Sequence, residues 1–80
     1  MNTVDIKTLL ADAETAGCNV VECFAIEAVE NAVAVHGIEA QWAKTDAFLY
    51  SWLGTVEDKL TSSDCPAEAK EWFKARGVEG

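Results

Sequence analysis

The chain has 80 residues, half of them apolar, with no stretch dominated by proline, glycine or serine. It is therefore long enough to build one hydrophobic core and too short to build two. Fourteen acidic residues against six basic ones give a formal charge of −8, which argues against direct binding to nucleic acid or to an anionic membrane surface.

The first predicted helix covers residues 4–16. Thr3 is suited to cap its start, and Gly17 is suited to end it. Ile6, Leu9, Leu10 and Ala13 recur at the spacing of one helical face, which predicts an amphipathic surface helix.

Residues 19–36 are predicted to form a second helix. Asn19 followed by Glu22 has the spacing of a capping box, and Gly37 supplies a left-handed stop. The apolar residues cover more than half of the helix circumference, so this helix should contact neighbours on two sides and form the centre of the core. Valine is abundant here, which leaves strands at residues 19–23 or 32–35 as an alternative, although the 3.6-residue period favours a helix.

Residues 38–60 are predicted to form one long third helix, because their apolar positions alternate in steps of four and three. The repeat consists of Ile38, Trp42, Thr45, Leu49, Trp52 and Val56. A straight helix of about 23 residues would extend roughly 34 Å, longer than such a bundle needs. We expect it either to project or to kink near Thr45 or Gly54, and Thr45 with Asp46 could cap a shorter helix that begins at Ala47.

A fourth helix is predicted at residues 66–76, where Pro66 suits the first helical position and Gly77 follows the end. Its apolar face of Ala69, Trp72 and Phe73 should dock on the bundle, so that all three tryptophans share one side of the core. The predicted architecture is all-α, a compact bundle of about four helices with one long third helix, in a single domain covering residues 1–80.

The location expected from the sequence is the cytoplasm. No apolar run reaches the roughly 18–20 residues that a membrane span needs, and the first residues lack the basic and apolar regions of an export signal. Cys18, Cys23 and Cys65 form an odd set, so we expect reduced thiols, with Cys18 the most reactive because it precedes a helix start.

The residues of the chain do not point to catalysis. His36 is the only histidine, at the end of the second predicted helix, where it balances the helix dipole. A zinc site built from the three cysteines and His36 would lack a Cys-x-x-Cys knuckle, and the glycines are too scattered for a phosphate-binding loop. We therefore expect no enzyme activity, no cofactor and no metal.

In length, acidity and helix count the chain is similar to acyl carrier proteins, which hold a prosthetic group on the serine of an Asp-Ser-Leu motif at a helix start. That motif is absent. Ser51 lies in the middle of a predicted helix and Ser63 precedes an aspartate, so no carrier function is expected.

Acidic residues dominate the stretch between Lys7 and Lys44, which contains no lysine or arginine. Its carboxylates include Asp12, Glu14, Glu22, Glu27, Glu30 and Glu39. Acid-rich helices can imitate the phosphates of nucleic acid, a device used by small phage inhibitors of restriction or CRISPR complexes. This pattern predicts a stoichiometric inhibitor or adaptor that binds a basic surface of a nucleic-acid-handling protein through these residues. An ordinary solubilising surface is the alternative explanation.

Small residues occupy one narrow arc of the third predicted helix, opposite the tryptophan and leucine positions. They are Ala40, Ala43, Ala47, Ser51 and Gly54, with Tyr50 beside them. Small side chains let helices approach closely, so the competing prediction is a structural or regulatory homodimer assembled through this arc. Alanine is also simply a good helix former on an exposed face.

Overall fold

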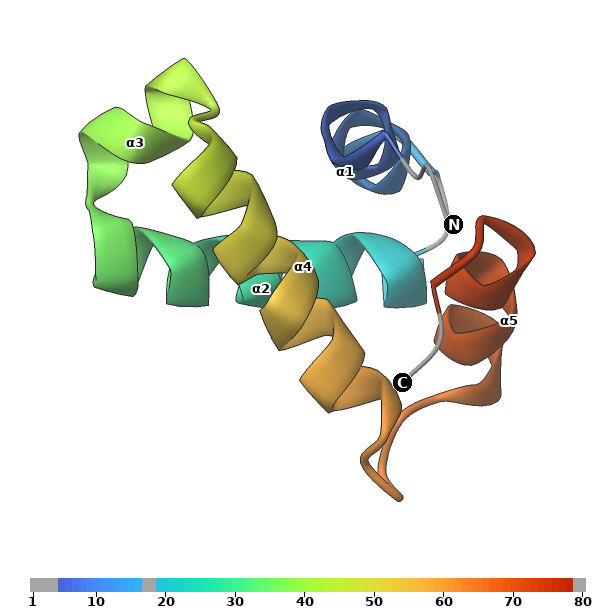
Figure 1. Cartoon of the computed structure of the whole chain (residues 1–80). Coiled ribbons are helices and arrows are strands. Elements are labelled where there is room, and N and C mark those ends of the chain that lie inside the picture. Colours follow the sequence, from blue (N-terminus) through green and yellow to red (C-terminus); the bar gives the residue numbers. More distant parts are fainter. Residues whose placement is uncertain (1–4, 17–18, 79–80) are drawn as a thin grey trace.

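Helices make up all the regular secondary structure in the part of the chain that the computed structural model describes, residues 5–16 and 19–78. They are α1 (Ile6–Glu14), α2 (Asn19–His36), α3 (Ile38–Ala43), α4 (Asp46–Leu60) and α5 (Ala67–Ala75) (Figure 1). The all-α prediction is confirmed. The strand alternative for parts of residues 19–36 is wrong, since α2 covers them without interruption.

The first helix begins at Ile6, slightly later than predicted, because Asp5 caps it. The Asp5 carboxylate accepts hydrogen bonds from the Thr8 backbone N–H (3.3 Å) and from the Thr8 hydroxyl (2.8 Å). Leu9, Leu10 and Ala13 face the core, as their spacing predicts. Thr3 and Gly17, the predicted cap and stop, lie outside the described residues.

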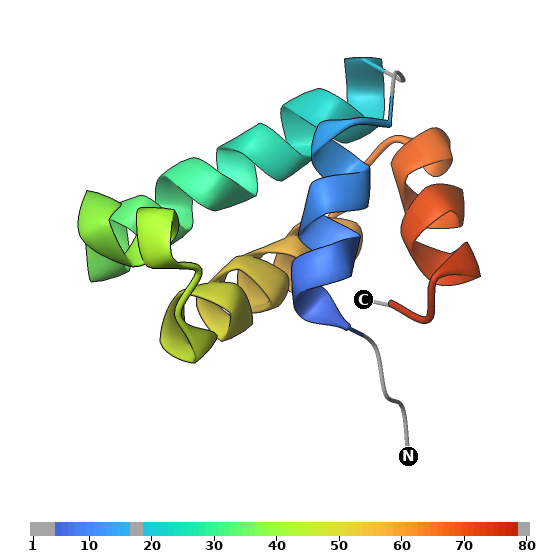
Figure 2. The ribbon, with the colours of Figure 1, turned by 90° about the horizontal axis from the view of Figure 1, so that it is seen from above.

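Helix α2 is the centre of the molecule, as its wide apolar arc predicts. It contacts each of the other four helices, and Figures 1 and 2 show α3 and α5 at opposite ends of it. Val21, Ala25 and Ala28 are fully buried along its inner side. Gly37 ends α2 with a φ of +91°, a value that few residues other than glycine adopt. The side chain of Asn19 lies outside the described residues, so its capping role stays a prediction.

The prediction of a single long third helix is wrong, because the helix is interrupted between α3 and α4. Lys44 adopts the left-handed conformation (φ 51°, ψ 48°) and ends α3. Thr45 then caps α4 by accepting a hydrogen bond from the Phe48 backbone N–H at 3.2 Å. The break falls at one of the two positions where a kink was expected, with α4 beginning at Asp46, whereas Gly54 lies inside uninterrupted helix. The molecule therefore has five described helices, not about four.

This break divides the predicted apolar repeat into a buried part and an exposed part. Leu49, Trp52 and Val56 of α4 are buried, whereas Ile38 and Trp42 of α3 are exposed. The expectation that all three tryptophans share one side of the core is wrong for Trp42, because α3 does not continue the axis that turns the α4 positions toward α2.

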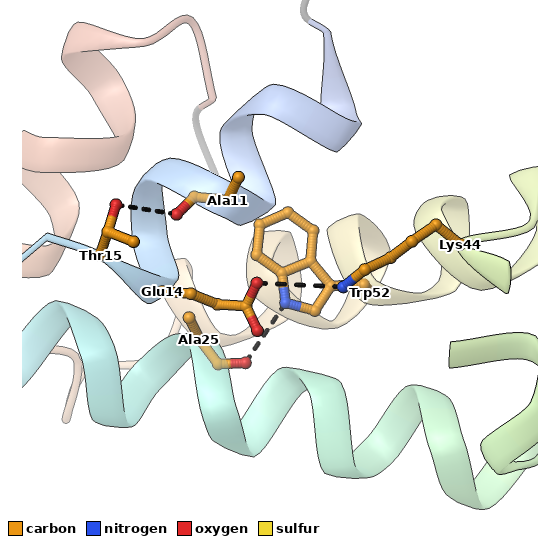
Figure 3. A network of polar contacts seen from close by, with 6 residues as sticks. All are labelled: Ala11, Glu14, Thr15, Ala25, Lys44 and Trp52. Carbon is orange, nitrogen blue, oxygen red and sulfur yellow. Dashed lines mark hydrogen bonds and ion pairs between the residues drawn. The ribbon is translucent and has the colours of Figure 1, made fainter. Parts of the chain in front are cut away.

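Aromatic rings from three helices form the centre of the core. Trp52 is fully buried, and its indole N–H donates a hydrogen bond to the Ala25 carbonyl of α2 at 3.3 Å (Figure 3). The ring of Phe73 in α5 lies 6.4 Å from that of Trp52 and 5.7 Å from that of Phe24, between centroids. These contacts join α2, α4 and α5 in one core.

Candidate protein-interaction surface

The acidic residues of the basic-free stretch come from three helices, and two of them line one groove. Glu14 and Glu30 line the same groove, between α1, α2 and α3. Glu27 lies elsewhere, beside Phe24 and Pro66 at the start of α5. Asp12, Glu22 and Glu39 lie on three different helices and are not among the residues that line the groove. Five of the six carboxylates are exposed and Glu22 is half-buried.

Two of these carboxylates have cationic neighbours within the chain. The Lys59 ammonium donates to Glu27 at 3.0 Å, which ties α4 to α2. The Lys44 ammonium lies 3.9 Å from a Glu14 oxygen and links the end of α1 to the break between α3 and α4 (Figure 3). Both pairs are partly exposed, so each contributes little to stability and leaves its carboxylate open to other cations.

The predicted small-residue arc is divided by the break in the third helix. Ala40 and Ala43 belong to α3, and Ala40 packs against the core. Ala47, Tyr50, Ser51 and Gly54 remain together on α4, where Ala47 and Tyr50 are exposed and the other two are half-buried. A Cβ atom built on Gly54 would have no atom within 4 Å, so nothing in the described residues requires a glycine there.

Three exposed apolar side chains lie close in the sequence at the junction of α2 and α3. They are Val35, near the end of α2, and Ile38 and Trp42, about one helical turn apart on α3, and they are 70%, 58% and 80% exposed. The other two tryptophans differ: Trp52 is buried, and Trp72 is covered by the Arg76 guanidinium, 3.7 Å from its ring. The sequence predicts Trp42 in the core and Ile38 in the same apolar repeat. Gly37 and Thr45, which bracket this short segment, were the signals that α3 is a separate helix.

An open groove adjoins α3 on the side of α1. It has a volume of about 600 Å³, and its lining is mostly aliphatic: Ile26, Val29, Val33 and Ala34 of α2, with Gln41 of α3. Glu14 and Glu30 add carboxylates to this lining. Both glutamates were predicted as binding residues from their charge, whereas the apolar surface beside them is seen only in the structure.

The described part of the chain contains cysteines and other candidate metal ligands. Cys23 and Cys65 are free thiols, as expected. Within residues 5–16 and 19–78, no three His, Cys, Asp or Glu side chains come together as ligands for a metal ion. Cys18 lies outside the described residues, and its predicted reactivity stays a prediction.

No protein-family model, curated protein or solved structure matches this chain. None of the helices in the described residues combines the length and the apolar character needed to cross a membrane.

Proposed function

We propose that this chain is a protein-binding module and not an enzyme, acting in the cytoplasm as a stoichiometric inhibitor or adaptor. The observation that carries the proposal is the exposure of Trp42 together with Ile38 and Val35. Large apolar side chains that gather on a surface mark interaction sites, and tryptophan is enriched among the residues that dominate binding energies. A separate helix, α3, presents this ring to solvent.

Charge supports a basic partner. The chain carries −8, and exposed Glu39 lies on α3 between Ile38 and Trp42 in the sequence. An acidic surface attracts a basic one and accelerates their encounter. Proteins that handle nucleic acid carry such basic surfaces, and we place the partner in this class, with a phage-type inhibitor of a defence complex included in the proposal.

The test is a pull-down from cell extract with the purified chain, eluted in rising salt and analysed by mass spectrometry. We expect a nucleic-acid-handling protein that is released as salt rises from about 0.05 to about 0.5 M, because screening weakens attraction between exposed charges. Trp42→Ser should abolish its capture. Tyr50→Ser, which removes an exposed aromatic ring from α4, is the matched control and should retain it. Capture that survives Trp42→Ser contradicts the proposal, and so does capture that is insensitive to salt.

A homodimer assembled through α4 is the second candidate. It is favoured by one observation: Tyr50 is 67% exposed beside Gly54, whose missing side chain leaves open space on the helix surface. A second α4 can approach closely at such a position. In this form the interface comprises Ala47, Tyr50, Ser51 and Gly54, without the α3 residues.

Analytical ultracentrifugation tests the homodimer. A dimer at micromolar concentration that dissociates with Ala47→Glu or Gly54→Lys supports it, and a monomer at every concentration removes it. Both variants should fold, since Ala47 is exposed and a Cβ atom at Gly54 has no neighbouring atom within 4 Å.

A further inference from the structure

The groove between α1, α2 and α3 exposes apolar surface that the fold leaves unfilled. Ile26 is 46% exposed although it is a β-branched aliphatic residue in the middle of the central helix. Val33 and Ala34 follow about two turns later and line the same groove. The groove therefore follows the α2 axis, as the apolar stripe of a docked helix would.

The groove also carries negative charge. Glu30 lies on α2 between Ile26 and Ala34, and no ion pair is found for it among the described residues. Glu14 contributes a second carboxylate from α1 and already attracts the Lys44 ammonium. Apolar surface beside two carboxylates is complementary to apolar side chains flanked by lysine or arginine.

The shape of the groove favours a macromolecule over a small ligand. Small-molecule sites enclose most of the ligand surface, whereas this hollow opens to solvent over three helices. A second copy of the chain fits poorly. The described helix richest in basic residues is α5, with Lys70 and Lys74. Its residues Ala69 and Phe73 are already fully buried in its own core, and its half-buried Trp72 lies under the Arg76 guanidinium.

We propose that this groove receives an amphipathic helix of the partner protein, with its apolar stripe on Ile26, Val29 and Val33 and its lysine or arginine side chains on Glu14 and Glu30. The inference rests on the proposed function and specifies how a basic partner is held. Trp42 then lies on the neighbouring helix, where it adds a contact outside the groove.

The experiment uses the whole chain and a synthetic amphipathic peptide of about 14 residues, roughly four helical turns, built from leucine, alanine and lysine. Two comparison peptides replace its lysines by glutamate or its leucines by serine. Binding is followed by NMR chemical-shift changes of the backbone amides. We expect the lysine–leucine peptide to shift the amides of Ile26, Val33 and Gln41 most, and both comparison peptides to bind weakly, since apolar contact and charge are each required.

Variants locate the binding surface. Glu30→Gln and Ala34→Lys should each weaken binding roughly five- to tenfold, because one removes a carboxylate and the other adds a cation in the groove. Both positions are exposed, so folding is preserved. Glu57→Gln, which neutralises an exposed carboxylate on α4, is the matched control and should leave the affinity unchanged.

Shift changes spread over the whole surface, or an equal loss with Glu57→Gln, would show attraction by net charge alone and overturn the inference. So would a serine peptide that binds as well as the leucine peptide. These failures leave the proposed function standing if Trp42→Ser still abolishes capture of the cellular partner. Conversely, capture that survives Trp42→Ser contradicts the proposed function while the peptide result is unaffected.

Discussion

At the scale of single residues, the three tryptophans show how position decides the role of one side chain. Trp52 of α4 is fully buried, lies near the Phe73 ring of α5 and donates a hydrogen bond to the Ala25 carbonyl of α2. Trp72 packs edge-on against Phe73, with 4.9 Å between the ring centroids, and is covered by Arg76. Trp42 is 80% exposed. The first two therefore contribute to stability, and only Trp42 is free to contact a partner.

Phenylalanine substitutions separate these roles. Trp52→Phe should lower the free energy of unfolding by about 1–3 kcal/mol, because it removes a buried hydrogen bond and leaves a cavity. Trp42→Phe should change it by less than about 0.5 kcal/mol, as expected for an exposed position. Urea denaturation followed by far-ultraviolet circular dichroism measures both. Equal losses would contradict the assignment of Trp52 to the core and Trp42 to the surface.

Asp5 is a second residue whose environment has a measurable effect. Hydrogen bonds from the Thr8 hydroxyl, and then from the Thr8 backbone N–H, hold the pKa of the Asp5 carboxyl below its usual 3.8. Because this pKa is lower in the folded state, the ionised Asp5 cap stabilises α1 at pH values above the pKa that the carboxyl has in the unfolded chain. The stabilisation is lost as the pH falls below about 4 and through the folded pKa.

Thr8→Val should therefore raise the pKa of Asp5 toward 3.8, because it removes the Thr8 hydroxyl, whose hydrogen bond lowers this pKa most. Thr8→Ser keeps the hydroxyl and should preserve the low pKa. Thr15→Val is the control, since the Thr15 hydroxyl donates to backbone carbonyls of Ala11 and Asp12 and to no carboxylate. NMR titration of the Asp5 side chain measures its pKa in each of the three variants. An Asp5 pKa that does not change in Thr8→Val contradicts the assigned cause.

At the scale of the helices, the break between α3 and α4 determines which surface the protein presents. Two local features produce it, the left-handed Lys44 and the capping side chain of Thr45. Together they let α3 turn away from the α4 axis (Figure 1). Ile38 and Trp42 therefore remain exposed to solvent.

Thr45→Ala should lower the free energy of unfolding by about 1 kcal/mol, because the Phe48 N–H loses its acceptor at the start of α4. Thr45→Ser retains the hydroxyl and should lose much less. Urea denaturation compares the two variants, and a serine variant as unstable as the alanine variant would show that the cap contributes nothing.

At the scale of the whole molecule, the dominant property is the excess of negative charge. Like charges on a small surface repel one another, and this repulsion opposes folding. Among the described residues, ion pairs join Lys44 to Glu14 and Lys59 to Glu27. Both are partly exposed, so they offset little of this repulsion.

Salt should therefore stabilise the isolated chain. Raising sodium chloride from about 0.02 to about 0.3 M should raise the midpoint of thermal unfolding by about 3–6 °C. A double variant with Asp12→Lys and Glu57→Lys, both at exposed positions, should respond less because its net charge is smaller. A midpoint that falls with salt would mean that attractive pairs outweigh the repulsion. The proposed complex has the opposite salt dependence.

Much of the fold followed from the sequence by itself, because helices are specified by neighbouring residues. Gly37 marks an end that the structure confirms, and the wide apolar arc of residues 19–36 identified the central helix. Pro66 lies at the N-cap of α5, one residue before the helical position that was predicted for it. The candidate site was harder to predict from the sequence. Glu14 and Glu30 were named for their charge, but nothing in their spacing along the chain brings them to one groove, since they belong to different helices.

Only the tertiary structure decided where each apolar residue points once the chain had turned. The repeat from Ile38 to Val56 has the same spacing whether or not the helix is continuous, so spacing alone could not separate a buried Trp52 from an exposed Trp42. That difference depends on whether the left-handed Lys44 and the Thr45 cap redirect the chain. It also depends on which surface of α2 remains available for packing once α1, α4 and α5 are in place. Long-range packing carries this information, because burial is a property of the assembled surface and not of any one segment.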